Sequence, residues 1–342
     1  MATGTGLDAQ LGFKGETTVG TAVTVDHFVE FNSEGLKFDP GFLEPTGLRA
    51  GRKYKRVSRV LQSRKSVSGD LELEVASRGM GLLWKHALGS TATATQISTT
   101  TAYRQIHIPV GMLGLGLTIQ VGRPEPSSGT VRPFTFRGCK VMSWEFKLSD
   151  NGIATLTLSI DGWNEDVSTA LATASYTSAN VYNFSQASLK LGGTASTTTG
   201  LMSVASGTAV AAVIKEMTIK GAVALATERF GIGNVGVKSE QLENDTPTVT
   251  GSLSAEFAKV ELYDVFKAGT TTAIELALTG SAIGVSGQND TLSFIMPAAK
   301  LKAAGPAVSG PGIVEMSTDF EAYDDETNAP IQVMVISADT AL

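Results

Sequence analysis

Apolar and polar residues alternate with a period of two over much of this chain, which is the pattern of half-buried β-strands. Segments of this kind recur along the first half, at residues 21–31, 102–108, 115–121, 131–136, 141–148 and 154–160. An Asn-Gly pair separates the last two segments, and this dipeptide suits the positive φ angles of a tight hairpin turn. The pattern therefore predicts a mostly β protein.

One segment of the first half follows a helical period instead. Met80, Leu83, Trp84 and Ala87 are spaced i, i+3, i+4 and i+7, so that they form one apolar stripe on a helix. A glycine follows the stripe and is a typical stop signal. We expect a helix at about residues 77–88.

The chain also resembles itself. VSGDLELEV at 67–75 matches VTGSLSAEF at 249–257, an offset of 182 residues. At the same offset the helical stripe recurs without a gap, which predicts a second helix at about 259–268. Further along, SWEFKLSD at 143–150 matches STDFEAYD at 317–324. Matches in the same order along both halves indicate an internal repeat.

We therefore predict a duplicated domain, with copy 1 in residues 1–172 and copy 2 in residues 173–342. A polar, low-complexity tract at 165–179 is a candidate linker between them. The alternative is that β proteins share hairpin patterns by composition alone.

Composition narrows the possible chemistry. The 342 residues are 42% hydrophobic and 18% charged, which is enough for packed cores, and the net charge of -6 argues against a generic basic nucleic-acid binder. One cysteine and three histidines leave little material for a metal site, and Cys139, His27 and His86 read as structural residues. No GxSxG, HExxH or GxxxxGK[ST] motif is present. We expect no enzyme activity, no catalytic or metal-binding residue and no cofactor.

Charge divides unevenly between the two halves. Residues 1–172 carry 18 basic and 16 acidic side chains, whereas residues 173–342 carry 9 and 17. Much of the positive charge is one run in copy 1, formed by Arg49, Arg52, Lys53, Lys55, Arg56, Arg59, Arg64 and Lys65. The matching stretch of copy 2 carries acids instead, which are Glu240, Glu243 and Asp245.

The basic run has two interpretations. It could contact nucleic-acid phosphates, or it could be a solvated arm that meets an acidic surface on a neighbouring subunit. The acidic counterpart in copy 2 favours the second interpretation.

A strand in each copy places polar residues on one face. Asp70, Glu72 and Glu74 alternate with apolar residues, and the matching strand carries Ser252, Ser254 and Glu256. This face could be an ordinary wet side of a sheet, or it could line an aqueous channel.

The residues now carry a family resemblance. The opening GLDAQLGFKGETTVGTAVTVDHFVEFNSEGLKFDPGFLEPTGLRAGRKYKR resembles the N-terminal region of tail tube proteins of long-tailed bacteriophages, particularly actinobacterial phages. The similarity continues through FGIGN, QLENDTPTVTGSL and the final SADTAL, so it covers nearly the whole chain.

The resemblance implies two tail-tube-type β-sandwich or split-barrel domains, each with a flanking helix and a long stacking loop. On this sequence, the stacking arms fall at about 38–66 and 221–248. Inner strands of six domains would close into one barrel around a lumen, so that three two-domain chains form a ring with pseudo-sixfold symmetry; a hexamer of chains is the alternative. Asp70, Glu72, Glu74, Ser252, Ser254 and Glu256 become candidates for the lumen surface.

The implied function is structural. Stacked rings would form a negatively lined channel through which genome DNA passes without specific binding, in a virion assembled in the bacterial cytoplasm. The implied partners are further copies of the chain, a tape-measure protein and tail tip or terminator proteins, with no membrane. Two alternatives remain, which are a nucleic-acid-binding β module that uses residues 49–65 and a β-sandwich adhesin or carbohydrate-binding protein that uses Trp163.

Overall fold

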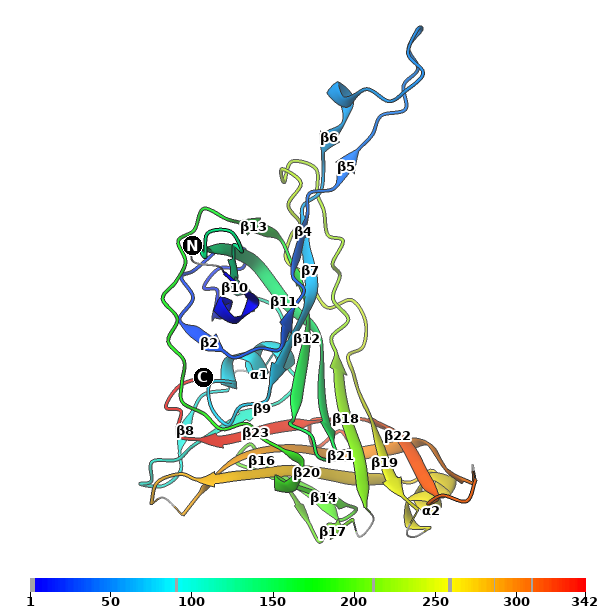
Figure 1. Ribbon diagram of the computed structural model, residues 1–342. Coiled ribbons are helices and arrows are strands. Elements are labelled where there is room, and N and C mark those ends of the chain that lie inside the picture. The colour runs from blue at the N-terminus through cyan, green and yellow to red at the C-terminus, as the bar shows by residue number, and fades with distance from the viewer. Residues whose placement is uncertain (1–3, 90–91, 211–212, 258–259, 286, 309) are drawn as a thin grey trace.

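The computed structural model describes residues 4–89, 92–210, 213–257, 260–285, 287–308 and 310–342. Strands account for 49% and helices for 7% of it, which confirms the prediction of a mostly β protein. The strands are antiparallel and most of them join one extended, strongly bent sheet (Figure 1).

The first half contains the following helices: η1 (Gly6–Asp8), η2 (Val57–Arg59) and α1 (Gly81–Leu88). Its strands are β1 (Gln10–Gly15), β2 (His27–Val29), β3 (Ser33–Glu34), β4 (Lys37–Asp39), β5 (Phe42–Leu43), β6 (Leu61–Gln62), β7 (Ser66–Glu74), β8 (Thr95–Gln96), β9 (Tyr103–His107), β10 (Leu117–Pro124), β11 (Val131–Ser149), β12 (Thr155–Gly162) and β13 (Asn164–Asp166).

The second half contains the helices η3 (Phe184–Gln186) and α2 (Glu261–Ala268). Its strands are β14 (Ala187–Leu191), β15 (Thr194–Thr198), β16 (Leu201–Ala205), β17 (Thr208–Ala209), β18 (Ile214–Ala222), β19 (Thr248–Glu256), β20 (Thr271–Ala282), β21 (Asn289–Ala307), β22 (Glu315–Ala322) and β23 (Gln332–Ser337).

The two halves pair their strands in the same order. In the first half the ladder runs β2–β1–β10–β11–β12–β7, and β7 then pairs with β3 and β4. In the second half it runs β17–β14–β20–β21–β22–β19–β18. Each half therefore folds one long central strand between an outer and an inner group of strands.

The register agrees as well as the order. Val67 lies opposite Gly162 in the first half, and Val249 lies opposite Ala322 in the second. The β11–β12 register shifts between Val141 and Ser143, and the β21–β22 register shifts at the equivalent point, between residues 301 and 303. Because a bulge is a specific local feature of a sheet, its recurrence at the same step shows close structural equivalence between the halves.

Two of the sequence matches need correction. The strand match at an offset of 182 coincides with β7 and β19, but the helices lie 180 residues apart, because the connection from strand to helix is two residues shorter in the second half. Gly89 and Gly269 end the two helices with φ of 70° and 63°. The segment 317–324 begins in β22, which occupies the place of β12, so its match with residues 143–150 of β11 is wrong.

The halves are joined edge to edge. Seven residue pairs connect β11 to β18, from Ser143 opposite Ala222 to Ser149 opposite Glu216. The join makes one continuous run of inner strands, which are β3/β4, β7, β12, β11, β18, β19, β22 and the C-terminal part of β21. A second contact is β9, which leaves the first half and pairs with β23 of the second (Figure 1).

One hydrophobic core serves both halves. Trp84 on α1 lies edge-on to Trp144 on β11 and to Phe294 on β21, with ring centroids 5.7 and 5.6 Å apart. Phe146 packs against the same Phe294 ring at 4.6 Å. Such a shared aromatic cluster fixes the two halves relative to each other, because neither half can bury these rings alone.

Two histidines are enclosed in this core. His86 on α1 and His107 on β9 are 3% and 0% exposed, and burial lowers the pKa of both imidazoles to about 3. Lys85 adds a smaller effect of the same sign. The native protein therefore keeps both rings neutral, whereas the unfolded chain binds protons below about pH 6.5.

We expect the free energy of unfolding to fall as the pH drops from about 6.5 toward 3, because only the unfolded state gains these two protons in that window. The slope approaches about 1.4 kcal/mol per pH unit for each histidine. Urea titrations at pH 7, 6 and 5 measure this slope at pH values above those at which most carboxylates titrate. The variant His86→Gln should lose about half of the slope, and a parental slope of zero would contradict the prediction.

Candidate functional site

The six residues that the sequence assigns to a channel surface lie on one face of the inner strands. Asp70 and Glu72 pair with Ser159 and Thr157 across β7 and β12, and Ser252 pairs with Asp319 across β19 and β22. The opposite face of the same strands holds the apolar core, including Leu71. Because side chains alternate along a strand, the continuous inner sheet has one buried face and one polar face. Whether this polar face borders a lumen stays a prediction.

The polar face is predominantly acidic. Its exposed and half-buried acids are Asp39, Asp70, Glu72, Glu74, Glu145, Glu216, Glu256, Glu315, Asp319 and Glu321. Its exposed and half-buried bases are fewer, and they include Lys37, Lys147, Lys215, Lys220, Lys300 and Lys302, of which Lys215 and Lys302 lie 3.4 and 3.0 Å from Glu256 and Glu321. Ion pairs hold part of this charge in place across the central join, where Lys220 lies 2.8 Å from Glu145 and Lys147 lies 3.1 Å from Glu216. The carboxylates of Asp70 and Glu72 accept hydrogen bonds from serine hydroxyls at 2.6 and 3.3 Å.

A long arm, residues 40–65, connects β4 to β7 and projects far beyond the rest of the chain (Figure 1). The short β5–β6 pairing braces its lower part. Apolar side chains stand in solvent along it, with Leu48 102%, Tyr54 90% and Val57 88% exposed. Of the predicted arm residues, Arg49, Arg52, Lys53, Lys55 and Arg59 are exposed and Arg56 is half-buried. Exposed apolar groups on a basic projection are features of a surface that binds a partner.

The second arm, residues 223–247, lies at the equivalent place between β18 and β19 but folds back onto the first half. Lys238 donates to both carboxylate oxygens of Asp161, at 2.6 and 2.8 Å, and the Gln241 amide adds a bond of 2.7 Å. Glu240 accepts from Lys140 at 2.7 Å. These contacts fasten the second arm over β11 and β12.

Burial shifts the pKa values of two side chains in this network. Desolvation raises the pKa of Asp161 against the opposing effect of Lys238 and Gln241, and it lowers the pKa of Lys140 against that of Glu240. Lys140 also donates to the carbonyl oxygens of Met112 and Gln241, at 2.7 and 3.0 Å. A buried charge with this many partners depends on all of them, because each unpaired group would keep its desolvation cost.

The acidic residues predicted for the second arm therefore divide in their roles. Glu240 and Glu243 bind within the chain, since their carboxylates also accept the backbone N–H groups of Gly114 and Met112 at 2.6 and 3.1 Å. Asp245 is exposed. Sequence reasoning missed the network itself, although a lysine inside the apolar strand 139–142 was a visible signal of a buried charge.

The two arms of one chain touch at their bases. Lys65 donates its backbone N–H to the Gly236 carbonyl at 2.8 Å, and Arg64 lies 2.9 Å from Glu228. The Arg64 guanidinium also stands over the Phe230 ring, 4.7 Å from its centroid. The first arm is thus held at its root, whereas its outer part is free of the body (Figure 1).

Trp163, the candidate carbohydrate-binding residue, contacts the second arm. It is half-buried, and its indole N–H donates to Gln241 at 3.0 Å. Cβ atoms added at Gly20 and Gly138 would come within 2.1 and 2.5 Å of its ring. The indole is therefore packed against backbone, which removes the observation that favoured an adhesin.

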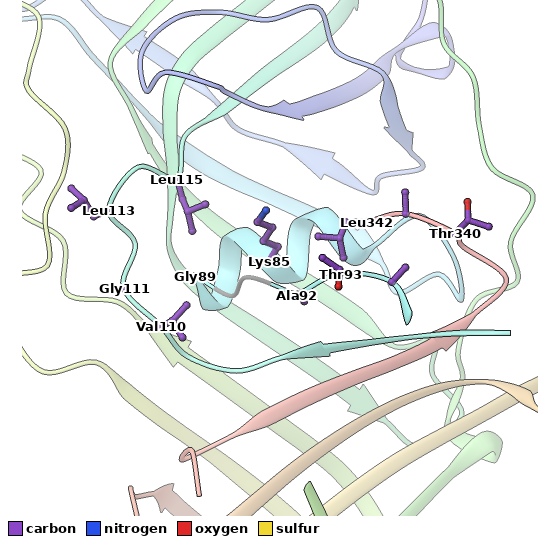
Figure 2. A pocket seen from close by; sticks show the side chains of 12 residues that line it. Lys85, Gly89, Ala92, Thr93, Val110, Gly111, Leu113, Leu115, Thr340 and Leu342 are labelled. Carbon is purple, nitrogen blue, oxygen red and sulfur yellow. The ribbon is translucent and has the colours of Figure 1, made fainter. Parts of the chain in front are cut away.

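An open groove of about 720 Å³ lies beside the C-terminal end of α1 (Figure 2). Val110, Leu113 and Leu115 line one side of it and Leu342 the other, and among the described lining residues Lys85 alone has an ionisable side chain. This lining offers packing surface but no acid–base pair.

The described residues contain no group of three or more His, Cys, Asp and Glu that could hold a metal ion. None of the helices in that part of the chain is long and apolar enough to cross a membrane.

A projecting arm with exposed apolar side chains is typical of a subunit that contacts a partner. In agreement, the family model described as phage tail tube protein matches residues 6–322. The chain therefore belongs to the phage tail tube family, and it is a structural component of the virion tail. This confirms, at the level of the family, the resemblance seen in the sequence. A search of the curated proteins finds no match.

Proposed function

We propose that three copies of this chain close into a ring with pseudo-sixfold symmetry, that rings stack into the tail tube, and that the polar face of the inner strands lines the channel for DNA. The observation that carries the proposal is the join between β11 and β18, which places two equivalent four-strand units side by side within one chain. A ring needs only to repeat this join between chains.

The equivalent pairing order and register of the halves support domain duplication, with copy 1 in residues 1–172 and copy 2 in 173–342. Eight inner strands per chain give about 24 strands for three chains. At about 4.8 Å between strands and a tilt of about 40°, the circumference is about 150 Å and the backbone diameter about 48 Å. Side chains would narrow this channel to under roughly 40 Å, which leaves room for a DNA duplex and a layer of water.

The acidic balance of the polar face supports the passage of DNA. Carboxylates repel phosphates, so the wall would let the duplex slide instead of holding it. The first arm would reach the adjacent ring, and the tape-measure and tail tip or terminator proteins would contact the tube during assembly.

Electron microscopy of the purified protein at high concentration tests the assembly. We expect stacked rings with a central hole and three chains per ring. A population that stays monomeric at every concentration and salt condition would contradict the proposal, and rings of six chains would replace the trimer by the hexamer.

The lumen assignment makes its own prediction. Substituting Asp70, Glu72 and Glu74 by lysine replaces three negative charges per chain on the polar face by three positive ones, so tubes of this variant should retain duplex DNA in a salt-dependent manner. Tubes of the parental protein should not retain duplex DNA. Filter binding with assembled tubes measures the difference, and substitution of three exposed acids off this face, Glu30, Asp324 and Glu326, by lysine serves as the control. Equal DNA retention by both variants would contradict the assignment of the polar face to the lumen.

A further inference from the structure

Each chain leaves two edges of its inner sheet unpaired. Among the described residues, β3 and β4 pair with β7 alone, and the C-terminal part of β21 pairs with β22 alone. Their counterparts inside the chain, β18 and β11, are paired with each other. We propose that β21 of one copy pairs with β4 of a second copy in the register that β11 and β18 use, and that Arg123 supplies a hydrogen-bond donor which this joint lacks. The inference rests on the proposed ring, because it specifies where the ring closes.

The register follows from the equivalence of the halves. Lys140 lies opposite Asp161 as Lys300 lies opposite Glu321, so β21 corresponds to β11 at an offset of 160 residues. Lys37 lies opposite Ser68 as Lys220 lies opposite Thr250, so β4 corresponds to β18 at an offset of 183.

The join between Ser143 and Ala222 then becomes Ala303 opposite Asp39 of the second copy. The following pairs in the joint are Ala304 with Phe38, Gly305 with Lys37 and Pro306 with Leu36.

Side-chain volumes fit this register. In the internal join Trp144 lies over Gly221, where an added Cβ would come within 2.3 Å of the indole nitrogen. In the joint between copies the large and the small residue change places, since Phe38 stands where the glycine was and Ala304 where the tryptophan was. An exchange of this kind keeps the total volume, which packing tolerates well.

The apolar residue at the C-terminal end of β21 also fits this register. Leu148 is 6% exposed in the internal join, whereas its counterpart Val308 is 79% exposed. Val308 lies just beyond β21, where a second copy would cover it. The exposure of Val308 in the single chain is expected if a second copy covers this residue in the ring.

Backbone hydrogen bonding raises a difficulty at one position. The Met142 carbonyl accepts from Val223 at 2.8 Å and Asp150 donates to the Lys215 carbonyl at 2.6 Å, so the even-numbered residues of this stretch face β18. Phe146 therefore points its N–H at Ile219. The counterpart of Phe146 is Pro306, which has no N–H to donate.

Arg123 resolves this difficulty. The carbonyl of Leu36, which would face Pro306, accepts a bond of 2.7 Å from the Arg123 guanidinium of its own chain. Glu34 holds that guanidinium with two bonds of 2.8 and 2.9 Å, and the Phe134 ring lies 4.5 Å from it. The carbonyl is thus satisfied before the second copy arrives, and its partner strand needs no donor there.

The joint should be weaker than the internal join because it lacks ion pairs. Glu145 and Lys147 form ion pairs across the internal join, but their counterparts are Gly305 and Ala307. Proline on an exposed edge also limits uncontrolled strand addition. The structure therefore assigns the reversible contact to the joint between copies and the permanent one to the chain itself.

Cysteine pairs test the register. Ala303→Cys and Asp39→Cys would face each other as a pair that does not exchange backbone hydrogen bonds, where side chains approach most closely. Oxidation of this variant should link the copies into closed rings that lack free ends. Cys139 is buried and burial raises the pKa of its thiol, so it does not compete. The matched control, Ala307→Cys with Asp39→Cys, displaces one cysteine by about 13 Å along the strand and should not cross-link. Efficient linking of the control, or none of the test pair, overturns the register whether or not tubes form.

A double substitution tests the role of Arg123. Arg123→Met removes the donor to Leu36 and should raise the concentration needed for assembly about tenfold, as expected for an unsatisfied carbonyl in the joint. Adding Pro306→Ala restores a backbone N–H and should recover most of this loss. Such a recovery could not arise within the fold of the single chain, because Pro306 and Arg123 would meet only between copies. Light scattering at matched folded fraction measures both. Failure of Pro306→Ala to rescue would refute the assigned role of Arg123, while loss of tubes in every background, including the parent, would refute the proposed function instead.

Discussion

Reversing the charge of four residues in the first arm, Arg52, Lys53, Lys55 and Arg56, to glutamate should abolish tube growth while leaving the fold intact. The arm projects away from the body and these side chains are exposed or half-buried, so the single chain loses little when they change. The four substitutions replace four positive charges per chain by four negative ones, which would turn attraction to an acidic neighbour into repulsion, an effect that is largest at low ionic strength. Tube length by electron microscopy and melting temperature by calorimetry measure the two effects.

A charge-preserving variant, with each arginine replaced by lysine and each lysine by arginine, is the matched control and should still assemble. Replacing Leu48, Tyr54 and Val57 by serine, with the basic residues kept, asks whether the apolar side chains of the arm matter as well. Normal tubes from the charge-reversed chain would exclude the first arm from stacking.

Lys238→Met should destabilise the folded chain by about 3–5 kcal/mol, because it leaves the Asp161 carboxylate buried with its main charge partner gone. Asp161 is enclosed, with its side chain 8% exposed, and Lys238 is 1% exposed. The second arm loses its central anchor on the first half in the same step. Urea unfolding at pH 7 measures the loss.

The partner variant separates charge from packing. Lys238→Met combined with Asp161→Leu removes both charges, and we expect it to recover most of the lost stability, since an apolar pair of similar volume does not pay for burying an ion. Lys190→Met, which breaks an ion pair with Glu275 at 3.1 Å on a half-exposed lysine, is the control and should change stability by less than about 1 kcal/mol. A small effect of Lys238→Met, equal to this control, would show that the buried network does not anchor the arm.

Much of the local structure could be predicted from the sequence. The period-two pattern at 141–148 and 154–160 predicted strands that the structure places in β11 and β12, because alternation follows directly from the geometry of a half-buried strand. The stripe at Met80 and Trp84 predicted α1 for the same kind of reason. The long loops at 38–66 and 221–248 lie where the structure has the arms.

The matches between the halves were only partly right. Strands β7 and β19 carry the similarity that local alignment detects, since both keep an alternating polar face. Residues 143–150 and 317–324 also share an alternating pattern, yet they occupy different places in the ladder. Alternation is common to all half-buried strands, so it cannot tell one strand of a sheet from its neighbour.

The sequence by itself determined the β class, the positions of the helices, the exposed basic run and the polar faces at Asp70 and Ser252, because each of these depends on neighbours along the chain. Only the tertiary structure decided that Lys140, Asp161 and Lys238 meet, that β9 crosses to β23, and that β11 and β18 join the two halves edge to edge. These contacts connect residues far apart in the sequence, and their pairing depends on the packing of the shared core, which no local pattern records.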